Sequence, residues 1–226
     1  MRERTVEKMN RVEIKICGIT NLADARYLAA AGADYLGFVQ SKASPRYLSA
    51  SSAGEIIEWV LGPKCVGVFV NENVDNINES IGTAGFDLIQ LHGNETVATC
   101  QAVDRPVIKA FRLTEGMDGN ELKKRMSAYR NVVEYFLIDA FHPTQFGGTG
   151  NTVDWQLAAS LASEFPLFLA GGLSPDNVNA AVQTVKPVGV DVSSGLEGEP
   201  GKKDFGKIDA FFSALERAEQ CRESTS

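Results

Sequence analysis

Residues 167–176 read LFLAGGLSPD, and they place a strand, a turn and the start of a helix in direct succession. The first four residues form a short apolar run, which is typical of a strand covered on both faces of a parallel sheet. Two glycines then break the run. Ser174 can cap a helix, Pro175 suits its first turn and Asp176 complements its dipole. A strand that leads into a helix in this way is the repeating unit of an α/β fold.

Seven more apolar runs lie along the chain, and segments with helical spacing separate them. We predict eight strands, over residues 12–17, 35–39, 65–70, 88–91, 107–111, 135–139, 167–170 and 188–192. Two of the helices have clear apolar stripes that can dock on a sheet, at Val74, Ile77 and Ile81 and at Phe205, Ile208, Phe212 and Leu215. Eight strands alternating with helices predict a (β/α)8 TIM barrel, an α/β fold with a single domain.

A doubly wound open sheet is the alternative architecture. It usually has fewer strands, and its first strand often leads into a GxGxxG turn. Here the first predicted strand leads into Cys17-Gly18-Ile19-Thr20, which lacks that glycine pattern. We therefore predict a barrel domain over residues 12–219, with loose ends at residues 1–11 and 220–226.

The charge balance of the 226-residue chain limits its partners. The chain has 22 Lys and Arg residues against 29 Asp and Glu residues, a formal net charge of −7. This balance argues against a polyanionic partner such as nucleic acid. No apolar stretch approaches the length of a membrane span, and the polar first ten residues lack the apolar core of a signal peptide. We expect no nucleic-acid or membrane partner and a cytoplasmic location.

The cysteines are widely spaced and form no CxxC pair; they are Cys17, Cys65, Cys100 and Cys221. This pattern indicates free thiols in a reducing compartment. Since the chain has only two histidines, we expect no histidine-rich metal site. Cys65, inside a predicted strand, and Cys100, on a predicted helix, fit the usual structural role of a buried cysteine.

Side chains that can do chemistry lie where the predicted strands end, and a barrel builds its active site at those C-terminal ends. Cys17 ends the first strand and Asp139 the sixth, while Arg46 and His92 follow the second and fourth. Each has a structural alternative. Cys17 could be a small buried hydrophobe and Asp139 a helix cap. Arg46 could be a solvated loop charge, and His92 a hydrogen-bonded histidine at a strand end.

Small residues follow the last two strands, at Gly171, Gly172, Ser193, Ser194 and Gly195. Barrels commonly bind phosphate at this place, with backbone N–H groups and a helix N-terminus. We therefore predict a phosphate site there, although each turn alone could be structural. Residues 140–151 carry three more glycines and form a long loop, which is either a mobile lid or a plain surface loop.

Six motifs occur in order at the strand ends and loops: KICGIT at 15–20, GF to SPRY at 37–47, LIQLHG at 88–93, GGTG at 147–150, LAGGL at 169–173 and GVDVSSG at 189–195. Together they resemble phosphoribosylanthranilate isomerase, an enzyme family of tryptophan biosynthesis, over about residues 12–215. Two departures concern the lid and the second loop. Val153 stands where the family often has an aromatic residue, and Gln40-Ser41 replaces a more apolar pair.

The resemblance implies an Amadori rearrangement of a small phosphorylated substrate, without cofactor or metal. N-(5-phosphoribosyl)anthranilate becomes 1-(2-carboxyphenylamino)-1-deoxyribulose 5-phosphate. By resemblance, Asp139 is the general acid and Cys17 the general base, so the first must hold a proton and the second must be a thiolate. Arg46 matches the residue that holds the anthranilate carboxylate, and His92 and Asp191 line the site. The oligomeric state stays open between monomer and homodimer.

Three other functions fit a phosphate-binding barrel. The related isomerase of histidine biosynthesis carries an aspartate on the first strand, and Cys17 argues against it. Indoleglycerol phosphate synthase relies on lysines and glutamates at strand ends, whereas Lys109 is the one strand-end lysine of note in this sequence. A non-catalytic phosphate-binding barrel would not need Cys17 and Asp139 together.

Overall fold

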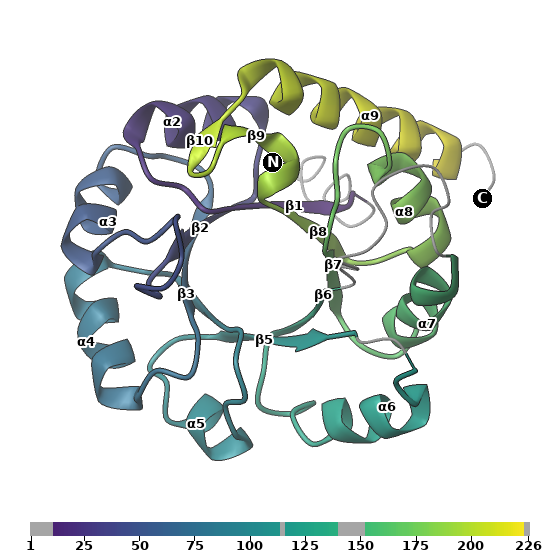
Figure 1. The fold of residues 1–226 in the computed structure, drawn as a ribbon, viewed down its shortest axis with the longest axis horizontal. Helices are drawn as coiled ribbons and strands as arrows, with labels where there is room; N and C mark the ends of the chain where they lie inside the picture. Colours follow the sequence, from purple (N-terminus) through teal and green to yellow (C-terminus); the bar gives the residue numbers. More distant parts are fainter. Residues whose placement is uncertain (1–10, 114–115, 140–151, 224–226) are drawn as a thin grey trace, which may run out of the picture.

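The computed structural model describes residues 11–113, 116–139 and 152–223. Eight parallel strands form a closed barrel in sequence order, and β1 pairs with β8 to close it (Figure 1). The strands are β1 (Glu13–Cys17), β2 (Tyr35–Val39), β3 (Lys64–Phe69), β4 (Leu88–Leu91), β5 (Val107–Arg112), β6 (Tyr135–Asp139), β7 (Leu167–Ala170) and β8 (Gly189–Val192). Each begins and ends within one residue of its predicted bounds, and the barrel prediction is confirmed.

A helix follows each barrel strand and covers the outside of the barrel (Figure 1). The helices are α2 (Leu22–Ala31), α3 (Ala50–Ile57), α4 (Val74–Ala84), α5 (Val97–Gln101), α6 (Gly119–Ser127), α7 (Thr152–Ala162), α8 (Val178–Val185) and α9 (Phe205–Glu223). Between β8 and α9 lie the 3₁₀ helix η1 (Ser194–Leu196) and an antiparallel hairpin of β9 (Glu197–Glu199) and β10 (Lys202–Lys203). The sequence did not predict this hairpin. Helix α9 also continues four residues past the predicted domain end at residue 219.

Two apolar clusters pack against the barrel wall, one on each side. Strand side chains such as Ile14, Leu36 and Phe136 are buried in the outer cluster, beneath the helices. The inner cluster is smaller and consists of Tyr35, Val66, Leu88, Ile108, Ala110, Leu137, Phe168 and Ala170. Since side chains alternate along a strand, Lys15 and Cys17 of β1 point to the same face. The inner face therefore carries both packing residues and polar groups.

The predicted start of α8 was wrong by several residues. The helix begins at Val178, and its N-cap position is Asn177, not Ser174. The Asn177 side chain turns back instead: it accepts from the Ser174 N–H at 2.9 Å and donates to the Gly172 carbonyl at 2.9 Å. These bonds tie residues 172–177 into a turn before the helix. Ser174 accepts from the Asp176 N–H within that turn, at 3.3 Å.

The apolar stripe of α9 was predicted only in part. Ile208 is fully buried as expected, but Phe211 takes the buried place that was assigned to Phe212. Phe205 is 41% exposed, and its ring stacks on Tyr27 of α2 with centroids 4.0 Å apart. The first residue of α9 thus packs on a neighbouring helix.

The described cysteines are free, and two of them are buried structural residues as predicted. Burial raises the pKa of Cys65 to about 12 and that of Cys100 to about 11, so both thiols stay neutral near pH 7. In the described part of the chain, no group of three or more His, Cys, Asp or Glu side chains could hold a metal ion. None of the helices in that part is long and apolar enough to cross a membrane.

Candidate active site

A pocket of about 820 Å³ opens at the C-terminal ends of the barrel strands. It brings together all ten residues that the sequence singled out: Cys17, Arg46, His92, Asp139, Gly171, Gly172, Asp191, Ser193, Ser194 and Gly195. Gln90 of β4 and Arg112 of β5 also line it, and neither was predicted. Residues 140–151, the predicted lid, lie outside the described residues.

Cys17 ends β1 beside a buried charge. Lys15, two residues earlier on the same face, is fully buried and donates to Asp191 of β8 at 2.8 Å. The strand register places these two residues side by side. Gly37 of β2 makes room for them, because a Cβ atom there would lie 2.9 Å from the Cys17 Sγ and 3.2 Å from the Lys15 Nζ. The thiol and the ammonium group are thus close neighbours on the inner wall.

Opposing effects act on the Cys17 thiol. Burial raises the pKa of this thiol, and the carboxylate of Asp191 acts in the same direction. The ammonium groups of Lys15 and Lys203 lower the pKa, but they do not outweigh burial. The free pocket therefore favours the neutral thiol, and a base at this position depends on nearby positive charge.

Arg46, in the loop after β2, is held by a carboxylate that the sequence did not single out. Glu197 of β9 accepts from the Arg46 Nε at 2.7 Å and also from its Nη2, a two-pronged contact. This hydrogen bonding raises the pKa of Arg46. Burial acts to raise the pKa of Glu197, but Arg46 and Lys203 outweigh it and lower the pKa. The guanidinium group is therefore fixed at the pocket wall in one orientation.

Lys203 of β10 connects this pair to the strand ends. Its buried Nζ donates to the Cys17 carbonyl at 2.7 Å, to the Ser193 carbonyl at 3.1 Å and to Glu197 Oε1 at 3.1 Å. Burial lowers the pKa of Lys203. The unpredicted hairpin thus ties the ends of β1 and β8 to the loop that carries Arg46.

His92, just after β4, lies between an amide and a carboxylate. Its Nε2 is 3.5 Å from Asp139 Oδ2, and its Nδ1 is 2.8 Å from the Gln90 Nε2. If the Gln90 amide donates to Nδ1, the neutral ring carries its proton on Nε2, toward Asp139. The other Gln90 amide atom, Oε1, is buried without a partner among the described residues.

The predicted phosphate loops lie against each other. Gly171 and Gly172 have φ angles of 96° and 65°, in the left-handed region that favours glycine. A Cβ atom on Gly195 would overlap the carbonyl oxygen of Leu173, so only glycine allows the two loops to approach so closely. Small glycine and serine residues, rather than charged ones, line the pocket along these two loops.

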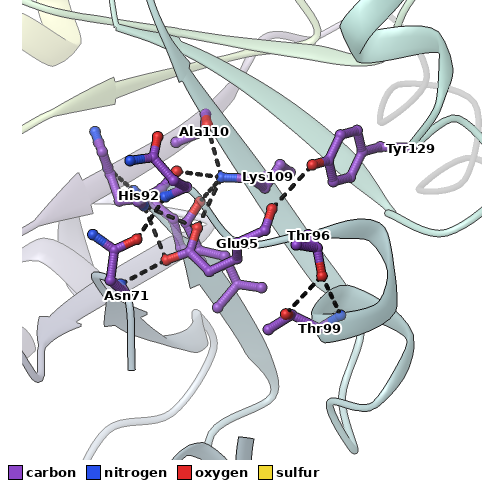
Figure 2. Close-up of polar contacts among 12 residues, drawn as sticks. Asn71, His92, Glu95, Thr96, Thr99, Lys109, Ala110 and Tyr129 are labelled. Carbon is purple, nitrogen blue, oxygen red and sulfur yellow. Dashed lines mark hydrogen bonds and ion pairs between the residues drawn. The ribbon is translucent and has the colours of Figure 1, made fainter. Parts of the chain in front are cut away.

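A third buried lysine supports the loop that carries His92 (Figure 2). Lys109 of β5 donates to Glu95 Oε2 at 2.9 Å and to the carbonyls of Leu91, Gly93 and Ala110 at 2.8–3.2 Å. Glu95 in turn accepts from the N–H groups of Asn71 and Gly93. These contacts fix the backbone after β4, next to the pocket.

Three charged residues that organise the site were missed. Lys15 stands between Ile14 and Ile16 in a predicted strand, which is a sequence signal for a buried and paired charge. Glu197 and Lys203 lie in a polar stretch, GLEGEPGKKD, whose hairpin and contacts had no comparable signal.

The chain matches a family model described as N-(5'phosphoribosyl)anthranilate (PRA) isomerase over residues 14–214. It belongs to this family. The N-(5'-phosphoribosyl)anthranilate isomerase of Pelobacter propionicus is 48% identical to the chain over 202 residues, which are 88% of the chain and 93% of that protein. The Aquifex aeolicus isomerase is 45% identical over 204 residues, covering 88% of the chain and 96% of that protein.

Solved structures of PRA isomerases have the same fold. The Thermotoga maritima enzyme superposes with a TM-score of 0.81 at 38% identity, covering 91% of this chain and 99% of that chain. A PRA isomerase in complex with reduced 1-(o-carboxyphenylamino)-1-deoxyribulose 5-phosphate superposes with a TM-score of 0.79 at 36% identity, with the same coverage. The family that the motifs indicated is confirmed.

Proposed function

We propose that this chain converts N-(5-phosphoribosyl)anthranilate to 1-(2-carboxyphenylamino)-1-deoxyribulose 5-phosphate, an aldose–ketose isomerisation in tryptophan biosynthesis. Its membership of the PRA isomerase family supports this reaction. Substrate and product are isomers, so proton transfers alone balance the reaction. The protein has to supply an acid, a base and a binding site for the phosphate.

Asp139 acts as the general acid and Cys17 as the general base. Asp139 protonates the ring oxygen, the C1–O bond breaks, and the nitrogen lone pair forms a C1=N Schiff base. The Cys17 thiolate then removes the proton from C2, which gives an enolamine. Protonation at C1 and loss of the hydroxyl proton at C2 complete the ketone. The observation that carries this assignment is that both groups reach one pocket, from the non-adjacent strands β1 and β6.

The remaining pocket residues hold the two ends of the substrate. The phosphate binds to backbone N–H groups near Gly171–Gly172 and Ser193–Gly195, where glycine allows close approach. Arg46 holds the anthranilate carboxylate. Because Glu197 takes its Nε and Nη2, the Nη1 side of the guanidinium group is left for that carboxylate.

A fluorescence assay that follows consumption of the anthranilate adduct tests this function. Cys17→Ala and Asp139→Asn should each lower kcat by roughly 10²–10⁴-fold. Cys100→Ala is the control, since this thiol is buried on α5 outside the pocket. No turnover by the wild type would overturn the proposal. If Cys17→Ala turns over at nearly the wild-type rate, Cys17 is not the general base. If Asp139→Asn loses substrate affinity but keeps its kcat, Asp139 binds the substrate and is not the general acid.

The alternatives have weaker support in the structure. The lysine that an indoleglycerol phosphate synthase would need, Lys109, is buried and paired with Glu95. The histidine-pathway substrate carries a second phosphate, and Asn94 and Glu95 stand after β4 in place of a second glycine-rich turn. Measuring kcat/KM for both Amadori substrates decides this point; comparable values would show dual specificity.

The same function indicates where the chain acts and with which partners. The chain acts in the cytoplasm on a small phosphorylated substrate, without nucleic-acid or membrane partners, as a monomer or homodimer. The Thermotoga maritima isomerase is described as dimeric, and monomers of it have also been crystallised. Light scattering after size exclusion distinguishes the two states.

A further inference from the structure

The lysine beside Cys17 has a place that packing alone does not explain. Lys15 is fully buried in the barrel, where an ammonium group is costly unless it is paired. Its Nζ donates to Asp191 at 2.8 Å, and the Cys17 thiol lies next to it, since a single Cβ atom on Gly37 would come within 2.9 Å of Sγ and 3.2 Å of Nζ. An ammonium group has three N–H donors, so this lysine is not saturated by its carboxylate.

We propose that Lys15 is a positioning residue for the reaction, whose buried ammonium group stabilises Cys17 as the thiolate that removes the substrate proton. The proposal rests on the proposed function, in which Cys17 is the base. No bond to Lys15 forms or breaks. Its charge offsets the charge on Sγ, and Asp191 keeps the lysine protonated and oriented.

The groups around Cys17 make Lys15 the main source of this stabilisation. From the hairpin, Lys203 donates to the Cys17 carbonyl and shares its charge with Glu197. Arg46, in the loop after β2, also lines the pocket, but its charge is paired with Glu197. Across the pocket lie His92 and Asp139, which contact each other. Among the charges that lower the pKa of Cys17, that of Lys15 has the largest effect.

Gly37 supports the same assignment. Its missing Cβ leaves space that both the thiol and the ammonium group use. A Cβ atom there would come within 2.9 Å of the Cys17 Sγ and 3.2 Å of the Lys15 Nζ, so these groups would have to move. The glycine therefore leaves room on β2 for the proposed ion pair between the Lys15 ammonium group and the Cys17 thiolate.

The test measures how fast iodoacetamide alkylates Cys17 as a function of pH, with the Cys17 peptide followed by mass spectrometry. Lys15→Met should move the alkylation midpoint to higher pH and lower the rate at neutral pH by roughly tenfold or more. Asp191→Asn should move the midpoint to lower pH, because it removes a negative charge and leaves the ammonium group. Opposite shifts cannot come from a general loosening of the barrel.

The matched control is the buried pair that Lys109 of β5 forms with Glu95, replaced as Lys109→Met with Glu95→Gln, which should leave the Cys17 midpoint unchanged. Should Lys15→Met fail to fold, the neutral double variant Lys15→Met with Asp191→Asn replaces it, with a smaller shift to higher pH. Unchanged or same-direction shifts in the Lys15 and Asp191 variants would overturn the proposal, as would an equal shift in the control. Turnover of Cys17→Ala separately tests whether Cys17 is the base at all.

Discussion

Two strands on different sides of the barrel each bury a lysine with a carboxylate, and the two pairs differ in their other contacts. Lys15 lies 2.8 Å from Asp191, and Lys109 lies 2.9 Å from Glu95. Lys109 also donates to three backbone carbonyls (Figure 2). Lys15 lies beside the Cys17 thiol instead, and both groups border the position that a Cβ atom on Gly37 would occupy.

The difference shows how to separate a structural charge from a functional one. Burial and a carboxylate partner are common to both lysines, so neither property marks function. Lys109 donates to Glu95 and to three backbone carbonyls, so all its N–H groups are used to fix a loop. The charge of Lys15, in contrast, also acts on a thiol that lines the pocket.

Breaking either pair should cost much stability. Lys15→Met and Lys109→Met each leave a buried carboxylate without its partner, so the free energy of unfolding should fall by about 3–5 kcal/mol. Urea titration measures the loss. The neutral double variants, with Asp191→Asn or Glu95→Gln added, should recover most of it. A cost below about 1 kcal/mol for one single variant would mean that this pair is hydrated in solution.

A third pair, Arg46 with Glu197, should affect substrate recognition more than stability, because one side of it faces the pocket. Arg46→Ala should lose a charge-assisted contact worth about 1.5–3 kcal/mol in kcat/KM. Glu197→Gln keeps the guanidinium group but weakens its anchoring, and it should lose less. If both variants keep the wild-type value, the carboxylate of the substrate binds elsewhere.

Gly37→Ala should displace the Lys15 and Cys17 side chains from their present positions. The added methyl group meets Sγ at 2.9 Å, so the thiol has to shift by a few tenths of an ångström. We expect kcat to fall by roughly tenfold, since small misplacements of reacting groups are costly. Gly67→Ala is the control: its methyl group meets the Phe86 ring, so it should lower stability without a matching loss of rate.

Most of the fold could be predicted from the sequence because strands that are buried on both faces form continuous apolar runs. The bounds of β7 and β4 were predicted to the residue. The start of α8 could not be predicted, because Asn177 uses its side chain to bond the preceding turn rather than the helix. Local propensity favours Ser174 as a cap, and contacts within the loop decide otherwise.

The members of the candidate site were easier to predict than their connections. Strand ends of a barrel converge, so Cys17 and Asp139 could be placed in one pocket from their positions alone. The links from Arg46 to Glu197 and from Glu197 to Lys203 join residues up to 151 positions apart through an unpredicted hairpin. No periodicity in the sequence reports such a contact, since it depends on how two loops meet.

The smallest expected effect is the response of stability to pH, and it separates the two buried pairs again. Hydrogen bonds and the charge of Lys109 outweigh burial and lower the pKa of Glu95, so this pair stabilises the fold above the unfolded pKa of about 4.3. That contribution disappears as the pH falls through the lower folded pKa.

Lys15 shows the opposite case. Burial acts to lower its pKa, but Asp191 and Cys17 outweigh burial and raise the pKa. The stability that the charged Lys15 gives the fold is therefore fully present below the unfolded pKa of about 10.4. It is lost as the pH rises through the higher pKa of Lys15 in the folded protein. Thermal unfolding between acid and alkaline pH should show both shifts: the neutral Lys109–Glu95 double variant should flatten the acid limb, where Glu95 titrates, and the neutral Lys15–Asp191 variant should flatten the alkaline limb, where Lys15 titrates. If both variants flatten the same limb, the two pairs are electrostatically equivalent, and the lysine beside Cys17 has no special place in the barrel.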